Sequence, residues 1–154
     1  MKLNKNDLAA AREYAFLLLK YRMRSEHELR LRMRRKKFDE RLIDETAEFL
    51  KEKKFIDDDS FAKAWVFSRK NQGFGLSRIA QELKLKGVPE EIVKNRISEG
   101  KGDYPEKQIV GELASRRLSK SKGVDPKTAK RRVYAYLLRR GFSPDVVIEV
   151  LNSR

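Results

Sequence analysis

Apolar residues recur at steps of three and four along most of this chain. In residues 7–22 the apolar positions are Leu8, Ala11, Ala15, Leu18 and Leu19. In the helix predicted from residue 39, one side carries Leu42, Ile43, Thr46, Phe49 and Leu50, of which all but the threonine are apolar. Side chains at this spacing share one face of a helix, which then tends to be buried. Because the few glycines and prolines fall between such stretches, we predict an all-helical protein and no strand.

The predicted helix starts carry residues that cap free backbone amides. Ser25 and Glu28 form a capping-box sequence, in which each side chain can accept the backbone amide hydrogen of the other residue. Asp125 precedes Pro126, which suits the first helical position because no hydrogen bond is lost there. We therefore predict helices that begin after residues 25 and 125.

Three segments, residues 34–43, 84–93 and 138–147, share one plan of basic helix end, tight turn, apolar residue, cap and apolar pair. Extending the alignment backward pairs Leu29 with Ile79 and Val133, at offsets of 50 and 54 residues. The chain therefore reads as three tandem three-helix repeats, over residues 1–54, 55–100 and 101–154. Such repeats contact mainly their neighbours, so we expect an elongated modular array that can curve.

The turns inside the repeats differ at one position. Gly87 and Gly141 stand where a helix ends in the left-handed conformation, which glycine adopts without steric penalty. Lys37 takes that place in the first repeat. The sequence leaves two readings open, a strained lysine or a different turn.

The charge balance indicates an anionic partner. Thirty-seven Lys and Arg against 23 Asp and Glu give a formal net charge of +14, which attracts nucleic acid and repels other copies of the chain, so we expect a monomer. No apolar run approaches the roughly 20 residues of a membrane span, and the N-terminal residues lack a signal-peptide pattern. The absence of cysteine suits a reducing compartment, and we expect the cytoplasm.

The positive charge is concentrated in two segments. Residues 22–37 hold eight bases and two acids, residues 116–140 hold ten bases and one acid, and residues 39–63 between them hold nine acids and five bases. Any single arginine in such a run is equally expected to be solvated or to contact a partner. The clustering of these residues, however, favours a binding surface. The predicted binding residues are Arg24, Arg30, Arg34, Arg35, Lys37, Arg69, Arg116, Arg117, Lys127, Lys130, Arg131, Arg132, Arg139 and Arg140.

Aromatic residues near these bases allow two interpretations. Tyr134 and Tyr136 can stack on nucleic-acid bases, although burial in the core is the commoner role. Phe74, between two glycines, is either an exposed contact or an apolar plug between repeats, and the plug is favoured. Trp65 is expected to be a packing residue of the second repeat.

No catalytic or metal site is predicted. The chain has no cysteine and one histidine, which excludes thiol chemistry and weakens histidine catalysis and most zinc sites. Asp57, Asp58 and Asp59 could attract Mg²⁺, but acids at a helix start more often cap backbone amides. We therefore expect a non-enzymatic protein without a cofactor.

The segment from Lys54 to Trp65, followed by Ser68, Arg69, Gly75, Ile79, Glu82 and Gly87, resembles the central signature of the RecX family. The first repeat is similar to that family's first module in Arg24, Ser25, Glu28, Leu29 and Phe38, although the family usually has glycine where this chain has Lys37 and Lys54. The resemblance implies tandem three-helix modules that lodge in the groove of a RecA filament on DNA. It also implies inhibition of recombinase and co-protease activity, with DNA contact that is not sequence-specific.

The sequence also bears on two other classes of function. Residues 71–96 read as two helices joined by a tight turn, so an independent regulator with helix-turn-helix-like units would show sequence preference on DNA. A nuclease or phosphotransfer enzyme would need a metal or base cluster, which the sequence does not offer.

Overall fold

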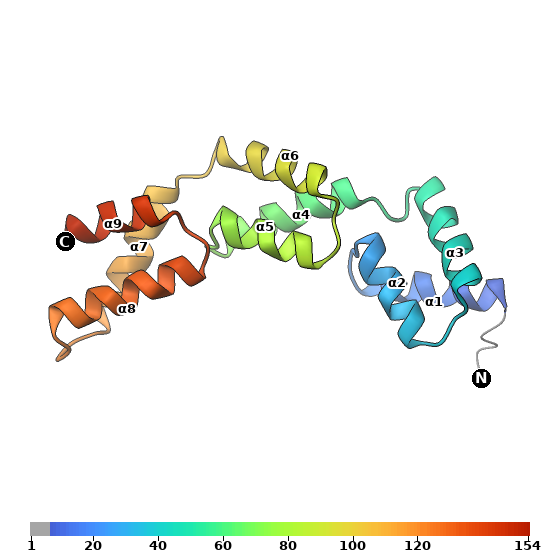
Figure 1. Ribbon diagram of the computed structural model, residues 1–154, viewed down its shortest axis with the longest axis horizontal. Coiled ribbons are helices and arrows are strands. Elements are labelled where there is room, and N and C mark those ends of the chain that lie inside the picture. The colour runs from blue at the N-terminus through green and yellow to red at the C-terminus, as the bar shows by residue number, and fades with distance from the viewer. Residues whose placement is uncertain (1–6) are drawn as a thin grey trace. The chain divides into compact units, whose positions relative to one another are not determined.

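The computed structural model describes residues 7–154, and within that range the chain forms nine α-helices and no strand (Figure 1). The all-helical prediction is confirmed. The helices are α1 (Leu8–Tyr21), α2 (Glu26–Arg35), α3 (Glu40–Glu52), α4 (Asp58–Asn71), α5 (Leu76–Leu85), α6 (Glu90–Lys101), α7 (Glu106–Ser119), α8 (Pro126–Arg139) and α9 (Pro144–Asn152).

Side chains cap α2, α4 and α8 as the sequence predicted, whereas Asp39 before α3 and Ser143 before α9 make no side-chain cap hydrogen bond. Ser25 Oγ accepts the amide hydrogen of Glu28 at 3.1 Å, and the Glu28 carboxylate accepts that of Ser25 at 3.3 Å, which completes the capping box of α2. Asp125 caps α8 by accepting from the Thr128 amide, with Pro126 in the first turn. Asp57 accepts from the amides of residues 59 and 60 at the start of α4, so it has the capping role.

The contacts group the chain into two compact units. Unit 1 joins the residues up to 64 with residues 83–93, and unit 2 joins residues 65–82 with residues 94–154. Helices α4, α5 and α6 therefore contribute to both units. The domain boundaries after residues 54 and 100, and the elongated arrangement of the repeats, stay predictions.

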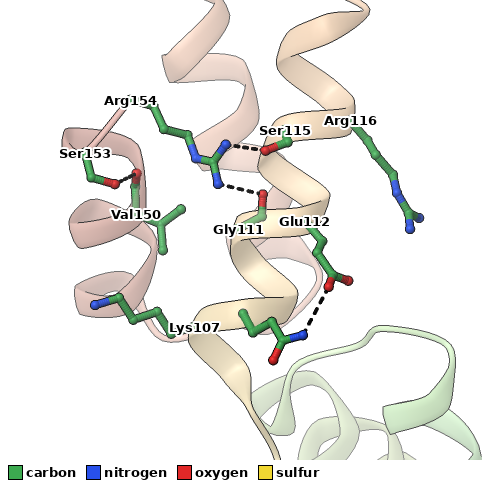
Figure 2. A pocket seen from close by; sticks show the side chains of 9 residues that line it. Lys107, Gly111, Glu112, Ser115, Arg116, Val150, Ser153 and Arg154 are labelled. Carbon is green, nitrogen blue, oxygen red and sulfur yellow. Dashed lines mark hydrogen bonds between the residues drawn. The ribbon is translucent and has the colours of Figure 1, made fainter.

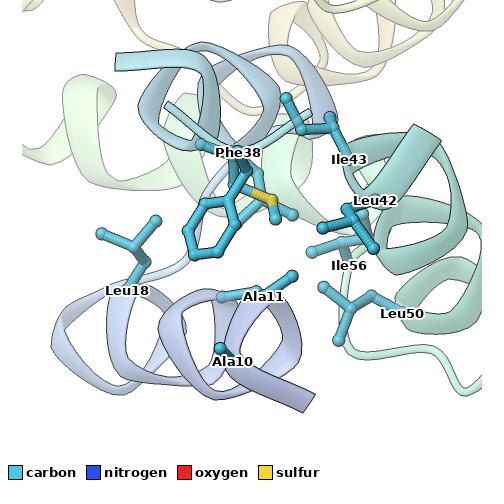
Figure 3. Packing of buried hydrophobic residues seen from close by; sticks show 11 residues of the cluster. Ala10, Ala11, Leu18, Phe38, Leu42, Ile43, Leu50 and Ile56 are labelled. Carbon is cyan, nitrogen blue, oxygen red and sulfur yellow. The ribbon is translucent and has the colours of Figure 1, made fainter. Parts of the chain in front are cut away.

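Unit 1 is built on a core between α1, α2 and α3 (Figure 3). Leu29 and Met33 of α2 are fully buried in one cluster with Ala11 and Ala15 of α1. Each large apolar side chain buried in this way contributes about 1.5–3 kcal/mol to folding. Further members of the cluster are Ala10, Leu18, Phe38, Leu42, Ile43, Leu50 and Ile56.

Unit 2 has a separate core formed by α7, α8 and α9. Its buried residues are Val110, Ala114, Val133, Leu137, Phe142, Val147, Val150 and Leu151. The predicted register holds across all three repeats, since Leu29, Ile79 and Val133 are 0%, 0% and 3% exposed. The equivalent set Met33, Leu83 and Leu137 is 0% exposed throughout. The repeat alignment is therefore confirmed in the packing.

The backbone decides between the two readings of the turn in the first repeat. Lys37 has φ 72°, close to the 74° of Gly87, and Lys54 has φ 62°. The turns thus share one geometry, and the lysines adopt a left-handed conformation that disfavours any side chain with a Cβ.

None of the helices that the structure describes combines the length and the apolar character needed to cross a bilayer.

Candidate nucleic-acid interface

The predicted binding residues divide between the two units. Unit 1 contains Arg24, Arg30, Arg34, Arg35 and Lys37. Unit 2 contains Arg69, Arg116, Arg117, Lys127, Lys130, Arg131, Arg132, Arg139 and Arg140. The two groups differ in how much of their charge is already neutralised, and each is described by itself.

Two arginines of unit 1 are held by carboxylates of the protein. Arg30 donates to Asp44 at 2.5 Å and to Glu26 at 3.2 Å. Arg34 donates to Glu40 through Nε at 2.6 Å and through Nη2 at 3.2 Å. A cation that already has a carboxylate partner gains less from a phosphate, because the existing ion pair must first be broken.

The other three predicted residues of unit 1 have no carboxylate partner within residues 7–154. Arg24 donates to the Leu18 carbonyl at 3.3 Å, and burial together with the nearby charge of Arg22 lowers the pKa of Arg24. Arg35 and Lys37 are exposed and make no ion pair with any residue that the structure describes. These two cations lie at the end of α2 and in the turn that follows.

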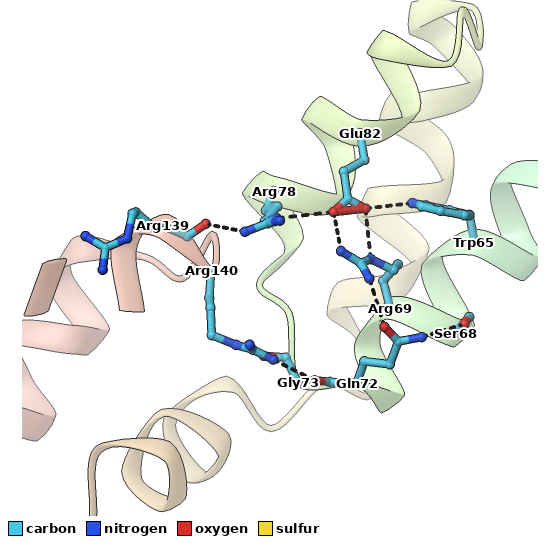
Figure 4. Close-up of polar contacts among 9 residues, drawn as sticks. All are labelled: Trp65, Ser68, Arg69, Gln72, Gly73, Arg78, Glu82, Arg139 and Arg140. Atoms are coloured by element: carbon cyan, nitrogen blue, oxygen red, sulfur yellow. Dashed lines mark hydrogen bonds and ion pairs between the residues drawn. The ribbon is translucent and has the colours of Figure 1, made fainter. Parts of the chain in front are cut away.

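In unit 2, Arg69 is part of a network around Glu82 (Figure 4). Glu82 accepts from Arg69 at 2.6 and 2.9 Å, from Trp65 Nε1 at 2.9 Å and from Arg78 at 3.2 Å. Burial acts to raise the pKa of Glu82, but the hydrogen bonds from Arg69 and Trp65 outweigh it and keep that pKa below its ordinary value. Trp65 is thus half-buried and tied to this network, rather than simply packed.

The ring of Phe74 lies close to Arg69 and Arg78 of this network and to Arg140. The guanidinium carbons of Arg69, Arg140 and Arg78 lie 3.7, 4.1 and 4.8 Å from the centre of its ring. Arg140 also donates to the carbonyls of Gln72 and Gly73 at 2.7 and 3.0 Å, contacts that Figure 4 draws. Phe74 is therefore half-buried and held by cation–π contacts to three arginines, which agrees better with the favoured plug than with an exposed contact.

A different arrangement lies between α7 and α8. Leu113, Arg116, Arg117, Lys120 and Tyr136 line a hollow of about 370 Å³, which we call the cationic ledge. The Arg117 guanidinium lies 3.7 Å from the ring centre of Tyr136, and that of Arg140 lies 5.6 Å from it. None of the lining residues is acidic. The ledge thus offers positive charge, and among the described residues none of its cations makes an ion pair.

Further cations follow along α8. Lys127, Arg131 and Arg132 are exposed, and none of them makes an ion pair with a described residue. Lys130 is half-buried and donates to the Arg154 carbonyl at 2.5 Å. The single acid of residues 116–140, Asp125, is already engaged in capping α8.

Arg139 is exposed at the end of α8, where its carbonyl accepts from Arg78 at 3.1 Å (Figure 4). Arg140 follows it and is turned inward to the Phe74 plug. Of these two neighbours, only Arg139 therefore presents its side-chain charge freely to solvent.

A second hollow, of about 550 Å³, lies between α7 and α9 (Figure 2). Its cations are largely engaged: Arg154 donates to Ser115 and to the Gly111 carbonyl, and Lys107 pairs with Glu149 at 2.6 Å. Arg116 borders both hollows and, in Figure 2, points away from Arg154. The ledge is thus the hollow with the more available charge.

The predicted set omitted two cations of the ledge and of the Glu82 network, Lys120 and Arg78. Lys120 stands four residues after Arg116 and three after Arg117, a helical spacing that would have placed it on the same face. Arg78 gave no comparable signal, because its role depends on Glu82 and on the carbonyl of Arg139.

Comparison with known proteins gives a consistent result. Models of the first, second and third three-helix domains of RecX match residues 11–50, 57–95 and 106–151. The regulatory protein RecX of Amycolatopsis mediterranei is 34% identical over 144 residues, covering 93% of this chain and 82% of that protein. The RecX of Chlorobium limicola is 32% identical over 150 residues, covering 97% and 90% respectively.

A solved structure shares the fold. The crystal structure of RecX from Lactobacillus salivarius superimposes with a TM-score of 0.80 at 20% identity, covering 95% of each chain. Together with the three matched domains, this confirms the prediction of three three-helix repeats in an all-helical fold.

Proposed function

The chain belongs to the RecX family, and on that premise we propose that it is a non-enzymatic regulator that binds RecA filaments on DNA and modulates, mainly inhibits, their recombinase and co-protease activity. The partners are then the RecA filament and its DNA, which can be single- or double-stranded. Such a role belongs to DNA repair, recombination and the SOS response, and to the cytoplasm. We expect the chain to act as a monomer, without a cofactor.

The observation that supports this proposal is the division of the cations into paired and unpaired groups. Arg30 and Arg34 are neutralised by carboxylates, whereas Arg116, Arg117 and Lys120 on the ledge are not. Unpaired cations on one surface release counterions from DNA without first breaking a protein ion pair. The ledge and the adjoining face of α8 are therefore our proposed DNA-contacting surface.

This surface carries charge without the features of base-specific recognition. Arginine–guanine and asparagine–adenine contacts require side chains that an inserted element, such as a helix or a β-ribbon, presents to base edges in the major groove. On the ledge, Tyr136 is half-buried and one of its ring faces is covered by Arg117. Contact to phosphates, which carries no sequence information, is the mode that this arrangement favours.

The test is RecA ATP hydrolysis on single-stranded DNA with increasing amounts of the chain. Inhibition at amounts well below the RecA concentration, with DNA in excess, supports action on the filament. Inhibition that disappears when more DNA is added would show simple competition for DNA and would contradict the proposal. The variant Arg116→Ala/Arg117→Ala should inhibit less, while the control Arg41→Ala/Lys63→Ala, which removes two exposed charges elsewhere, should inhibit normally.

Competition binding with the same protein distinguishes the filament regulator from the alternative function. A regulator with helix-turn-helix-like units in residues 71–96 would discriminate among DNA sequences in competition binding. Equal competition by unrelated sequences favours the filament regulator.

A further inference from the structure

Unit 1 exposes aromatic side chains at the edge of its core, where α1 meets the end of α3. Phe16 is 37% exposed and Leu17 49% exposed on α1, and Phe55 is 54% exposed in the connection between α3 and α4. The ring of Phe16 meets Phe55 edge-to-face at 5.0 Å and Phe49 at 6.4 Å. We call the set Phe16, Phe49 and Phe55 the aromatic face.

Local backbone structure holds this face in place. Phe55 follows Lys54, whose left-handed conformation reverses the chain after α3. The amides of Phe55 and Ile56 then both donate to the Leu50 carbonyl, at 2.8 and 3.4 Å. Ile56 is directed into the core at 4% exposure while Phe55 stays outside. The exposure of Phe55 is therefore fixed by the turn and does not reflect a loose side chain.

An arginine beside the face lacks a partner. The Arg12 guanidinium lies 3.9 Å from the ring centre of Phe49, and its Nε is buried with no hydrogen-bond acceptor. Among the described residues Arg12 makes no ion pair. The Arg12 side chain as a whole is half-buried, so a carboxylate on a partner can pair with the guanidinium without first breaking an ion pair of this protein.

The charges around the face are mixed. Along the sequence its aromatic residues are flanked by both signs, and Lys51 pairs with Glu48 at 3.0 Å. The flanking bases are Arg12, Lys20, Lys51, Lys53 and Lys54, and the flanking acids are Glu13, Glu48, Glu52 and Asp57. Arg12 lies directly against a ring of the face, so it is the cation that a carboxylate on a docked partner would meet.

The chemistry favours a protein over a nucleic acid. Bases stack on open ring faces, but here Phe16 meets its neighbours edge-to-face and Arg12 covers one face of Phe49. Exposed aromatic residues beside an arginine are instead typical of the energetically dominant centre of protein interfaces. Isolated apolar residues elsewhere, such as Phe67 on α4, lack this combination.

We propose that the aromatic face of unit 1 docks a protein surface in which an apolar residue lies beside carboxylates, one of which reaches Arg12. The inference rests on the proposed function, under which that surface belongs to the recombinase subunits of the filament. Protein contact through unit 1 and DNA contact through the ledge are then separate activities of one chain.

The test compares binding to RecA-coated single-stranded DNA with binding to the same DNA without RecA, using a labelled chain. Phe55→Ser and Arg12→Gln should each weaken binding to the coated DNA at least tenfold and leave binding to bare DNA within twofold. The matched control Phe67→Ser removes an exposed phenylalanine of 70% exposure outside the face and should change neither. Far-UV circular dichroism and thermal unfolding verify that each variant is folded. If Phe55→Ser does not fold, Arg12→Gln, which keeps most of the side-chain packing, still tests the docking surface.

The outcomes separate the two proposals. Unchanged binding of both folded variants to coated DNA overturns the docking surface and leaves the proposed function standing. An equal loss on coated and bare DNA also overturns it, because the face would then bind nucleic acid. A wild-type chain that binds coated DNA no better than bare DNA overturns the proposed function itself.

Discussion

Gly87 lies against His27 so closely that a Cβ on Gly87 would overlap the Cβ and ring of His27. The Ser25 hydroxyl donates to the Lys86 carbonyl at 2.6 Å beside this contact. The turn after α5 thus rests on the first residues of α2 within unit 1. Glycine is required at residue 87 both for its left-handed backbone and for the space it leaves.

The same contact occurs a second time, within unit 2. A Cβ on Gly141 would overlap the backbone nitrogen and Cβ of Arg78, and the Gly75 amide donates to the Arg140 carbonyl at 2.8 Å. The turn after α8 therefore rests on the start of α5 as the turn after α5 rests on the start of α2. Sequence repetition has produced a repeated contact.

Replacing Gly87 by alanine should destabilise the chain by about 2–4 kcal/mol, since the left-handed penalty and the overlap with His27 act together. Urea unfolding followed by circular dichroism measures the change. Gly123→Ala is the matched control, because Gly123 has φ 84° but a Cβ at that residue would meet no atom within 4 Å, so only the backbone penalty applies. Equal losses for the two variants would contradict the role of the His27 contact.

Lys37→Gly and Lys54→Gly should each stabilise the chain by about 0.5–1 kcal/mol, because glycine removes the left-handed penalty at the expense of unfolded-state entropy. Thermal unfolding of the single variants and of the double variant measures the gain. Lys36→Gly, at a neighbouring residue with φ −77°, should instead destabilise. A loss of stability in both left-handed variants would show that their lysine side chains make contributions greater than the backbone penalty.

Removing charge from the ledge should weaken DNA binding in a salt-dependent way. If about six cations contact phosphates, the logarithm of the binding constant for duplex DNA falls against the logarithm of salt concentration with a slope of roughly −5. Arg116→Ala/Arg117→Ala should reduce the magnitude of that slope by roughly two, about one for each lost contact. Fluorescence anisotropy across a salt series measures it. Arg41→Ala/Lys63→Ala should leave the slope unchanged, and an unchanged slope in the ledge variant would exclude the ledge from the interface.

Glu82 makes stability depend on acidity. Its pKa in the folded state lies below the ordinary 4.5. The carboxylate therefore contributes stability that is fully present above pH 4.5 and is lost as the pH falls through the lowered folded-state pKa. Glu82→Gln should be less stable than the parent chain near neutral pH, and this difference should shrink in acid. Urea unfolding over a pH series measures both effects, with Glu13→Gln as an exposed control; a difference that does not vary with pH would contradict the assignment.

Local patterns in the sequence were sufficient to predict the helices, the repeat register and the capping of α2. The buried series Leu29, Ile79 and Val133 follows from helical spacing alone, since residues three and four apart share a face whatever the helix packs against. The Ser25 and Glu28 cap likewise joins residues only three positions apart. Structural features that join residues a few positions apart are determined by the local sequence.

Only the tertiary structure decided which cations are available to a partner. Arg30 and Arg34 belong to the same basic run as Arg35, yet Asp44 and Glu40 on the next helix neutralise the first two alone. Arg69 and Arg140 likewise turn inward to Phe74, while Arg117 lies over Tyr136 at the ledge. The physical reason is that a charge run specifies which residues are basic, whereas an ion pair or a stacked ring requires a partner that packing brings from another helix.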